Sequence, residues 1–162
     1  RIKSRFWHPL EMKFSLLLAF AFAVPLADAA LTFPSIGYVQ SAAVNGTLTC
    51  NGKPTHAKVK LYDEDDTDMD DLMDEGVTDE EGFFHLSGKE SEITPIEPKV
   101  NIYHNCNDDE SLNPLKKVCY KKISIDLPAS YITDGPVAEK VFPLGTLNLA
   151  GSFKGETRDC LN

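Results

Sequence analysis

The stretch GVTDEEGFFHLSG, residues 76–88, contains two short runs joined by a turn. Asp79 to Gly82 supply the turn signal, and Phe83, Phe84 and Leu86 follow in a run that suits a strand. This pattern predicts a β-hairpin. Since no amphipathic helical stretch of useful length occurs in residues 30–162, the sequence predicts an all-β fold.

Segments on both sides of the hairpin alternate apolar and polar residues with the period of a strand. In residues 119–128, CYKKISIDLP, the residues Ile123, Ile125 and Leu127 occupy alternate positions. The run ends at Pro128, which cannot donate a hydrogen bond to a sheet. Further strands are expected at residues 42–50, 57–63, 98–106 and 145–151, with a possible strand at 137–142 and a corner or single helical turn at 129–136.

One predicted strand leaves its register open. In residues 98–106, PKVNIYHNC, either Val100 and Ile102 point inward, or Asn101 and Tyr103 do. In both cases the spacing of strands and turns favours a β-sandwich of about seven to eight strands.

The stretch LYDEDDTDMDDLMDEG, residues 61–76, contains nine carboxylates and no Lys or Arg. A helix-loop-helix calcium site starting at Asp63 would need Gly at its sixth position and a bidentate Glu at its twelfth. Asp68 and Asp74 stand there instead, so this motif is rejected. The stretch is therefore predicted to be a strand end followed by a short, solvated helical turn.

These carboxylates are nevertheless the best candidates for a charged recognition surface. A generic calcium site at the end of a sandwich is the alternative interpretation, but we expect no metal and no cofactor. The three histidines at 56, 85 and 104 fall on different segments without a ligand-pair spacing. The candidate acidic recognition surface consists of Asp63, Asp65, Asp66, Asp68, Asp70, Asp71 and Asp74.

Residues 12–29 have the features of a secretory signal peptide. A basic start at Lys13 precedes a short apolar run, and Ala27-Asp28-Ala29 is a small-residue cleavage site. The apolar run is too short for a membrane-spanning helix. We therefore expect residues 1–11 to be a leader-like or non-native extension, residues 12–29 a signal peptide, and residues 30–162 one secreted domain.

Charge and cysteine content agree with an extracellular chain. The net charge of −9 disfavours binding to nucleic acid or directly to an anionic membrane. An even number of cysteines without a CxxC pair predicts two disulfides in an exported chain. Four cysteines allow three pairings; because Cys106 and Cys119 flank a polar, Pro-containing loop, we pair these two and leave Cys50 with Cys160.

Several segments together resemble a known family. GTLTCNGKP, VKLYDEDD, TDEEGFFHLSG, EPKVNIYHNCND, YKKISIDLPASYI and LNLAGSFKGETRDC occur in that order between about Gly46 and Cys160. They are similar to the nematode transthyretin-like protein family. The resemblance implies a secreted, disulfide-tied β-sandwich of the transthyretin (prealbumin) type.

The resemblance also sets the functional hypotheses. It implies extracellular binding or signalling at a cell surface or in a host. Export, the disulfides, the small domain and the lack of a convergent acid/base constellation then predict a module without catalysis, which presents loops or an acidic end to a protein or lipid partner. A carrier of a small hydrophobic ligand, as in transthyretin, is the first alternative, and its oligomeric state stays open. A hydroxyisourate-type hydrolase is the second; residues 157–162, TRDCLN, lack the Tyr-Arg-Gly-Ser ending of those enzymes.

Asn45-Gly46-Thr47 forms an acceptor sequence for N-glycosylation. Use of this site requires the Asn45 side chain to face solvent. An unmodified Asn45 next to a turn is the alternative interpretation.

Overall fold

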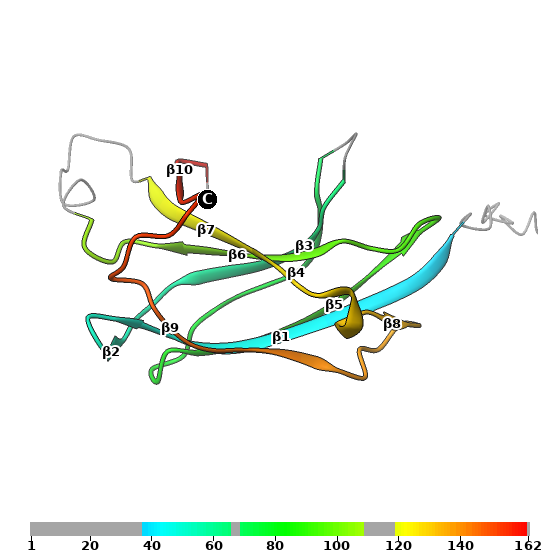
Figure 1. Ribbon diagram of the computed structural model, residues 1–162, viewed down its shortest axis with the longest axis horizontal. Helices are drawn as coiled ribbons and strands as arrows, with labels where there is room; N and C mark the ends of the chain where they lie inside the picture. Colours follow the sequence, from blue (N-terminus) through cyan, green and yellow to red (C-terminus); the bar gives the residue numbers. More distant parts are fainter. Residues whose placement is uncertain (1–36, 66–68, 109–118, 162) are drawn as a thin grey trace, which may run out of the picture. The chain divides into compact units, whose positions relative to one another are not determined.

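The computed structural model describes residues 37–65, 69–108 and 119–161. This part of the chain is all-β, with a single 3-10 turn, η2 (Ala129–Tyr131), and no α-helix. Two sheets pack face to face as a sandwich, which confirms the predicted fold class (Figure 1). No helix among these residues has the length and apolar content needed to cross a membrane.

The first sheet, sheet A, is built around its longest strand. β1 pairs antiparallel with β5 along one edge and parallel with β9 along the other, while the two short strands β2 and β8 pair at its ends. The strands of sheet A are β1 (Tyr38–Cys50), β2 (Lys53–Pro54), β5 (Phe83–Glu92), β8 (Thr133–Asp134) and β9 (Val141–Asn148).

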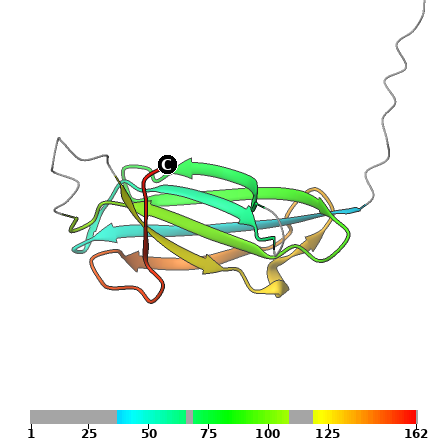
Figure 2. The same cartoon turned by 90° about the horizontal axis from the view of Figure 1, so that it is seen from above.

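The second sheet, sheet B, is antiparallel throughout and has the order β10-β7-β6-β3-β4. Figure 2 shows the two layers from above. Its central strand, β6, is buried on both faces, which the sequence pattern did not show. The strands of sheet B are β3 (Lys58–Asp63), β4 (Asp71–Val77), β6 (Pro98–His104), β7 (Tyr120–Asp126) and β10 (Thr157–Asp159).

The core lies between the sheets, where alternate positions of the strands meet. Val100 and Ile102 are fully buried and belong to the core cluster, which settles the register of β6 in favour of the first option. The turn at residues 79–82 forms as predicted: the Gly82 N–H donates to the Asp79 carbonyl at 3.0 Å. The β-hairpin predicted for residues 76–88 is wrong, because β4 pairs with β3 in sheet B and β5 pairs with β1 in sheet A, so this turn connects the two sheets. η2 is the corner expected near residue 129.

Along one side of the sandwich the edge strands β4 and β5 lie close together. The Asp74 carboxylate accepts a hydrogen bond from the Ser87 N–H at 2.8 Å. A Cβ atom on Gly88 would lie 2.5 Å from the Met73 Cβ atom, so only glycine permits this approach. The hydrogen bond of Asp74 and the close approach at Gly88 thus cover the edges of β4 and β5, which would otherwise expose unpaired backbone groups.

The predicted helical turn within residues 61–76 is wrong. After residues 66–68, which lie outside the described part, Asp71 begins strand β4, and β4 pairs with β3 from Asp63↔Asp71 to Lys58↔Val77. Pairing with β3 satisfies the backbone of this segment despite its poor strand propensity. The acidic stretch therefore belongs to a β-hairpin.

The predicted disulfide pairing is also wrong, although all four cysteines form disulfides. Cys50 pairs with Cys106, and Cys119 pairs with Cys160. The first bond joins the end of β1 in sheet A to the end of β6 in sheet B. The second follows from β10, whose Asp159 lies opposite Tyr120 and brings the next residue opposite Cys119. On the loop-entropy model, closures of 56 and 41 residues each stabilise the fold by about 4 kcal/mol.

Candidate functional site

The inner faces of both sheets change from apolar to acidic toward one end of the sandwich. On β3 the inward-facing positions run from Leu61 to Asp63, and both residues are buried. On β5 the inward-facing row that contains Leu86 continues to Glu90 and Glu92. Because strands alternate with a period of two, the row that builds the core also brings carboxylates into the gap between the sheets.

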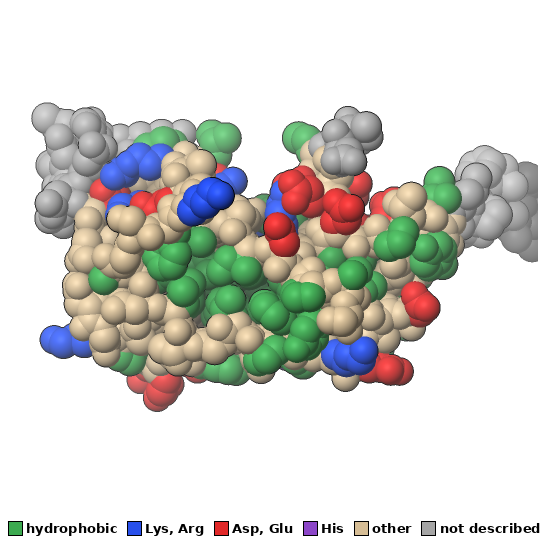
Figure 3. Space-filling model, viewed as in Figure 1, with side chains coloured by type: hydrophobic (Ala, Val, Ile, Leu, Met, Phe, Trp, Pro, Cys, Tyr) green, Lys and Arg blue, Asp and Glu red, His purple; other side chains and the backbone are tan. Residues whose placement is uncertain are grey.

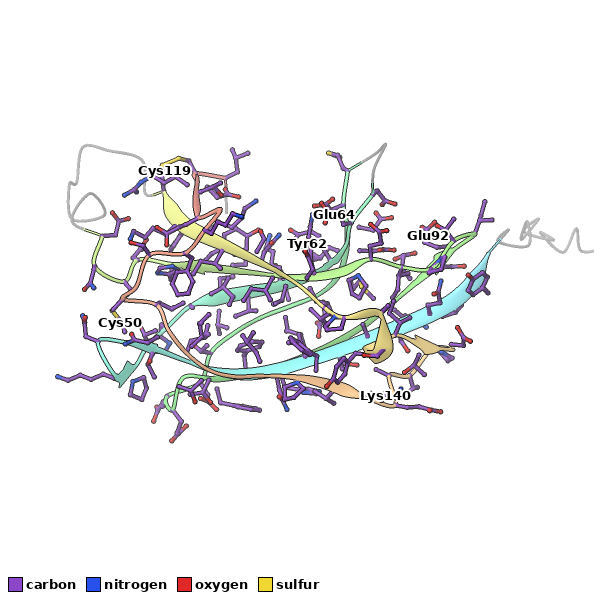
Figure 4. All side chains as sticks on the ribbon, in the orientation of Figure 1. Cys50, Tyr62, Glu64, Glu92, Cys119 and Lys140 are labelled. Carbon is purple, nitrogen blue, oxygen red and sulfur yellow. A yellow bond between two sulfur atoms is a disulfide. The ribbon has the colours of Figure 1, made fainter. Side chains whose placement is uncertain are left out.

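This arrangement forms a cavity of about 580 Å³, here called the acidic cleft. Figure 4 shows Glu64 and Glu92 toward the same end, away from Cys50 and Cys119. None of the described residues lining the cleft is Lys or Arg. The lining consists of the acidic residues Asp63, Glu64, Asp65, Glu92 and Glu97 and the uncharged residues Ile93, Thr94, Pro95, Ile96, Ala129 and Ile132.

The innermost carboxylate of the cleft is Asp63, which is 2% exposed. Its Oδ1 atom accepts a hydrogen bond from the Glu97 N–H at 2.7 Å. Burial raises the pKa of Asp63 to about 6; this hydrogen bond opposes the shift, and the charges of Asp65, Glu92 and Glu90 add to it. A negative charge on Asp63 is therefore unfavourable at the base of the cleft. A cationic group bound there would stabilise the ionised carboxylate.

Next to the cleft, three carboxylates lie unusually close together. Oxygen atoms of Asp71, Glu90 and Glu92 lie within 4.8 Å of one another. In Figure 3, acidic side chains gather beside the tip of the β3–β4 hairpin. Like charges at this distance raise the local negative potential, which attracts positively charged groups.

Two buried polar side chains hold the walls of the cleft in place. Gln40 donates from Nε2 to the Thr94 carbonyl at 2.8 Å and accepts from the Ile96 N–H at 3.3 Å, so it fixes the loop between β5 and β6. Lys99 Nζ lies 3.0 Å from Glu64 and 2.8 Å from Asp70. Burial lowers the pKa of Lys99, but the two carboxylates raise it by more than burial lowers it. The pKa of Lys99 is therefore above its ordinary value.

Comparisons with known proteins agree with this fold. The model of the transthyretin-like family (TTR-52) matches residues 45–128. Transthyretin-like protein 5 of Caenorhabditis elegans is 49% identical over 135 residues, which cover 82% of this chain and 93% of that protein. This chain belongs to the transthyretin-like family. Transthyretin-like protein 33 of the same organism is 43% identical over 127 residues, covering 77% of this chain and 85% of that protein.

In this transthyretin-like chain, the predicted acidic surface divides into parts with different surroundings. Asp65 lines the cleft and Asp71 belongs to the carboxylate trio. Asp63 is buried inside the sandwich, so its assignment to the surface is wrong. Asp70 pairs with Lys99, and Asp74 accepts hydrogen bonds from the Glu75 and Ser87 N–H groups. Asp66 and Asp68 lie outside the described residues.

The sequence analysis missed several residues of the cleft. Glu92, at the end of β5, and Glu97, just before β6, lie outside the acidic stretch and line the cleft, while Glu90 belongs to the carboxylate trio beside it. The alternation of Glu90 and Glu92 in KESE was a usable signal, since it places both on one face of a strand. No comparable signal marks Gln40, whose role depends on a loop 54 to 56 residues away.

The histidines of the transthyretin-like chain divide between two places. His56 and His104 line one cavity of about 480 Å³ with Tyr103 and Tyr120, whereas His85 lies on the outer face of sheet A. Burial lowers the pKa of His104, and its Nδ1 atom accepts from a backbone N–H at 3.2 Å. Among the described residues, three ligating groups come within 4.8 Å of one another only in the carboxylate trio.

Proposed function

We propose that this protein is a secreted, non-catalytic binding module whose acidic cleft receives a Lys- or Arg-rich segment of an extracellular protein. The observation that carries the proposal is the concentration of carboxylates in a concave site between the sheets. Export is supported by the signal-like residues 12–29 and by the two disulfides, which are typical of oxidising compartments.

The charge of the cleft favours a cationic partner. Lys99 balances Glu64 and Asp70 at one wall, while Asp65, Glu92 and Glu97 line the cleft without a basic neighbour in its lining. A cleft with one sign of charge and low-dielectric walls focuses its field on an approaching ligand. Complementary charge speeds association and selects against acidic competitors.

The uncharged part of the lining favours long basic side chains over a small cation. Ile93 is 71% exposed and lies beside Pro95 in the cleft lining. Lys and Arg can pack their methylene groups on such a surface while their charged ends reach the carboxylates. Arg adds bidentate hydrogen bonds to a carboxylate, so Arg-rich segments should bind more tightly than Lys-rich ones.

The chemistry of the cleft supports binding more than catalysis. Its described lining offers carboxylates, a threonine and apolar side chains, but no histidine, cysteine or lysine to form a nucleophile–base pair. The known relatives are named as transthyretin-like proteins, and their names state no activity.

The proposal is tested by titrating the full chain with an arginine-rich peptide and with an uncharged peptide of the same length in a calorimeter. The double variant Asp65→Asn, Glu92→Gln should bind the basic peptide about 10-fold more weakly, and wild-type affinity should fall with added salt. The matched control, Glu80→Gln with Glu81→Gln, removes two charges from the β4–β5 turn at the other end of the sandwich. Equal loss of affinity in both double variants would refute a specific site.

A calcium-bridged lipid headgroup is the other partner that the carboxylate trio suits, because hard cations bind clustered carboxylate oxygens. Flotation with vesicles that contain an anionic phospholipid, with calcium or with a chelator, separates the two partners. Calcium-dependent flotation without peptide binding would replace the basic segment by a lipid surface. Peptide binding that persists in chelator supports the protein partner.

A further inference from the structure

The outer face of sheet A contains an uncharged patch in a chain that is otherwise strongly acidic. Its positions alternate with the inward-facing core residues Val44, Leu86 and Phe142, so the register of β5, β1 and β9 places them on the outside. None of these residues is Asp, Glu, Lys or Arg. The uncharged patch consists of Phe83, His85 and Ser87 on β5, Asn45 and Thr47 on β1, and Val141, Pro143 and Thr146 on β9; Ala43 lies in the same row but is 1% exposed.

Asn45 stands at the centre of the uncharged patch. It lies opposite His85 on one side and Pro143 on the other, and both neighbours are exposed. The Asn45 side chain is partly exposed and makes no hydrogen bond to a described residue. The Asn45 amide nitrogen is therefore not engaged by the described part of the chain.

The middle residue of the acceptor sequence points the other way. A Cβ atom on Gly46 would lie 3.0 Å from atoms of Leu144 and Phe84, which pack inside the sandwich. Core packing thus favours glycine at this position. The two residues that glycosylation needs, Asn45 and Thr47, both stay on the outer face.

We infer that Asn45 is N-glycosylated and that its glycan covers the uncharged patch. The Asn45 Nδ2 atom forms a bond to C1 of the first sugar and loses a proton, while the bond from C1 to the diphosphate of a polyprenyl-linked oligosaccharide breaks. The transfer occurs on the unfolded chain in the secretory pathway, so the later position of Asn45 within a strand does not prevent it. Folding then leaves the glycan on the outer face.

The surroundings give the glycan a role. Phe83 is 42% exposed and Val141 is 37% exposed, and the row formed by His85, Asn45 and Pro143 lies between them. Exposed apolar side chains on a surface without charged residues allow contacts between copies of the chain, because no like-charge repulsion opposes them there. A sugar ring at Asn45 would pack over Phe83, which is diagonal to it across the strand pair. The glycan therefore keeps sheet A out of contacts between copies and leaves the acidic cleft open.

The inference goes beyond the proposed function and uses residues outside the cleft. The test is to express the full chain in a eukaryotic secretory host and map Asn45 by mass spectrometry before and after treatment with an N-glycosidase. Conversion of Asn45 to Asp by the enzyme is the expected result. Thr47→Ser should keep the glycan, and Thr47→Ala should lose it. Secreted protein with unmodified Asn45 would overturn the inference.

Coverage of the patch is measured with diethyl pyrocarbonate, which acylates exposed histidines. His85 should react severalfold more slowly in the glycosylated chain than in Thr47→Ala or in bacterially produced protein of the same sequence. His56, exposed near β3 in the other sheet, should react equally in all three and serves as the internal control. Equal reactivity of His85 with and without the glycan would refute the covering role.

Discussion

Replacing Asp63 by Asn should change the free energy of unfolding in a pH-dependent way. Relative to wild type, the variant should be more stable at neutral pH than it is at acidic pH. Asp63 lies at the base of the acidic cleft, is 2% exposed and accepts the Glu97 N–H through Oδ1. Asparagine can keep that hydrogen bond because its side-chain carbonyl also accepts. The substitution thus removes the charge while keeping the shape and the acceptor.

The magnitude follows from the pKa of Asp63, which rises from 3.8 in the unfolded chain to about 6 in the fold. Because the pKa is raised in the folded state, the contribution of Asp63 to the free energy of unfolding is fully present below pH 3.8. This contribution is lost as the pH rises through about 6. Each pKa unit corresponds to about 1.4 kcal/mol, so the loss reaches at most about 3 kcal/mol. Asp63→Asn should not lose this stability, because asparagine does not ionise.

Urea unfolding followed by far-ultraviolet circular dichroism, at about pH 4 and about pH 7, measures the effect. At each pH, the free energy of unfolding of wild type is subtracted from that of the variant, and the two differences are compared. Effects of altered hydrogen bonding that do not depend on pH cancel in this comparison. Asp126→Asn, at an exposed position on β7, is the control and should show little change. A difference for Asp63→Asn that stays constant with pH would refute the role assigned to burial and to the neighbouring carboxylates.

Three further predictions concern the same end of the sandwich and its closed side. Gly88→Ala should destabilise the fold by about 1–3 kcal/mol in urea unfolding, because the added Cβ would lie 2.5 Å from the Met73 Cβ, whereas Gly151→Ala, with its nearest atom at 3.9 Å, should be nearly neutral. Asp74→Ala should cost about 0.5–1.5 kcal/mol by the same measurement, since water replaces the carboxylate as acceptor for two exposed backbone N–H groups. Calorimetric affinity for the arginine-rich peptide should fall as pH drops through about 6, because protonation of Asp63 removes negative charge beneath the ligand.

The fold could be predicted from the sequence where one face of a strand meets the core and the other does not. β7, with Ile123 and Ile125 at alternate positions, is an example. Local patterns of this kind record which side of a strand is buried. β6 carries less information, because Lys99 and Tyr103 on its outer face are buried as well.

The prediction was wrong where pairing between distant segments decides the structure. β10 has three residues and no apolar alternation, yet its pairing with β7 fixes the Cys119–Cys160 bond. Without β10, the hairpin loop between β6 and β7 made Cys106 and Cys119 look like partners. Similarly, the β4 segment has many residues that disfavour strands, and its pairing with β3 overrides them.

The disulfides and the acidic cleft lie at different ends of the sandwich, and this separation has a physical basis. All four cysteines lie at or just beyond the ends of β1, β6, β7 and β10, whereas the cleft is bounded by the ends of β3 and β5. The clustered carboxylates weaken the cleft end through mutual repulsion, and only non-covalent bonds such as those of Gln40 and Lys99 hold its walls. The covalent links at the other end limit the entropy of the unfolded chain and so offset this weakness. A basic segment entering the cleft would stabilise the less constrained end, which means that partner binding and the stability of the domain are coupled.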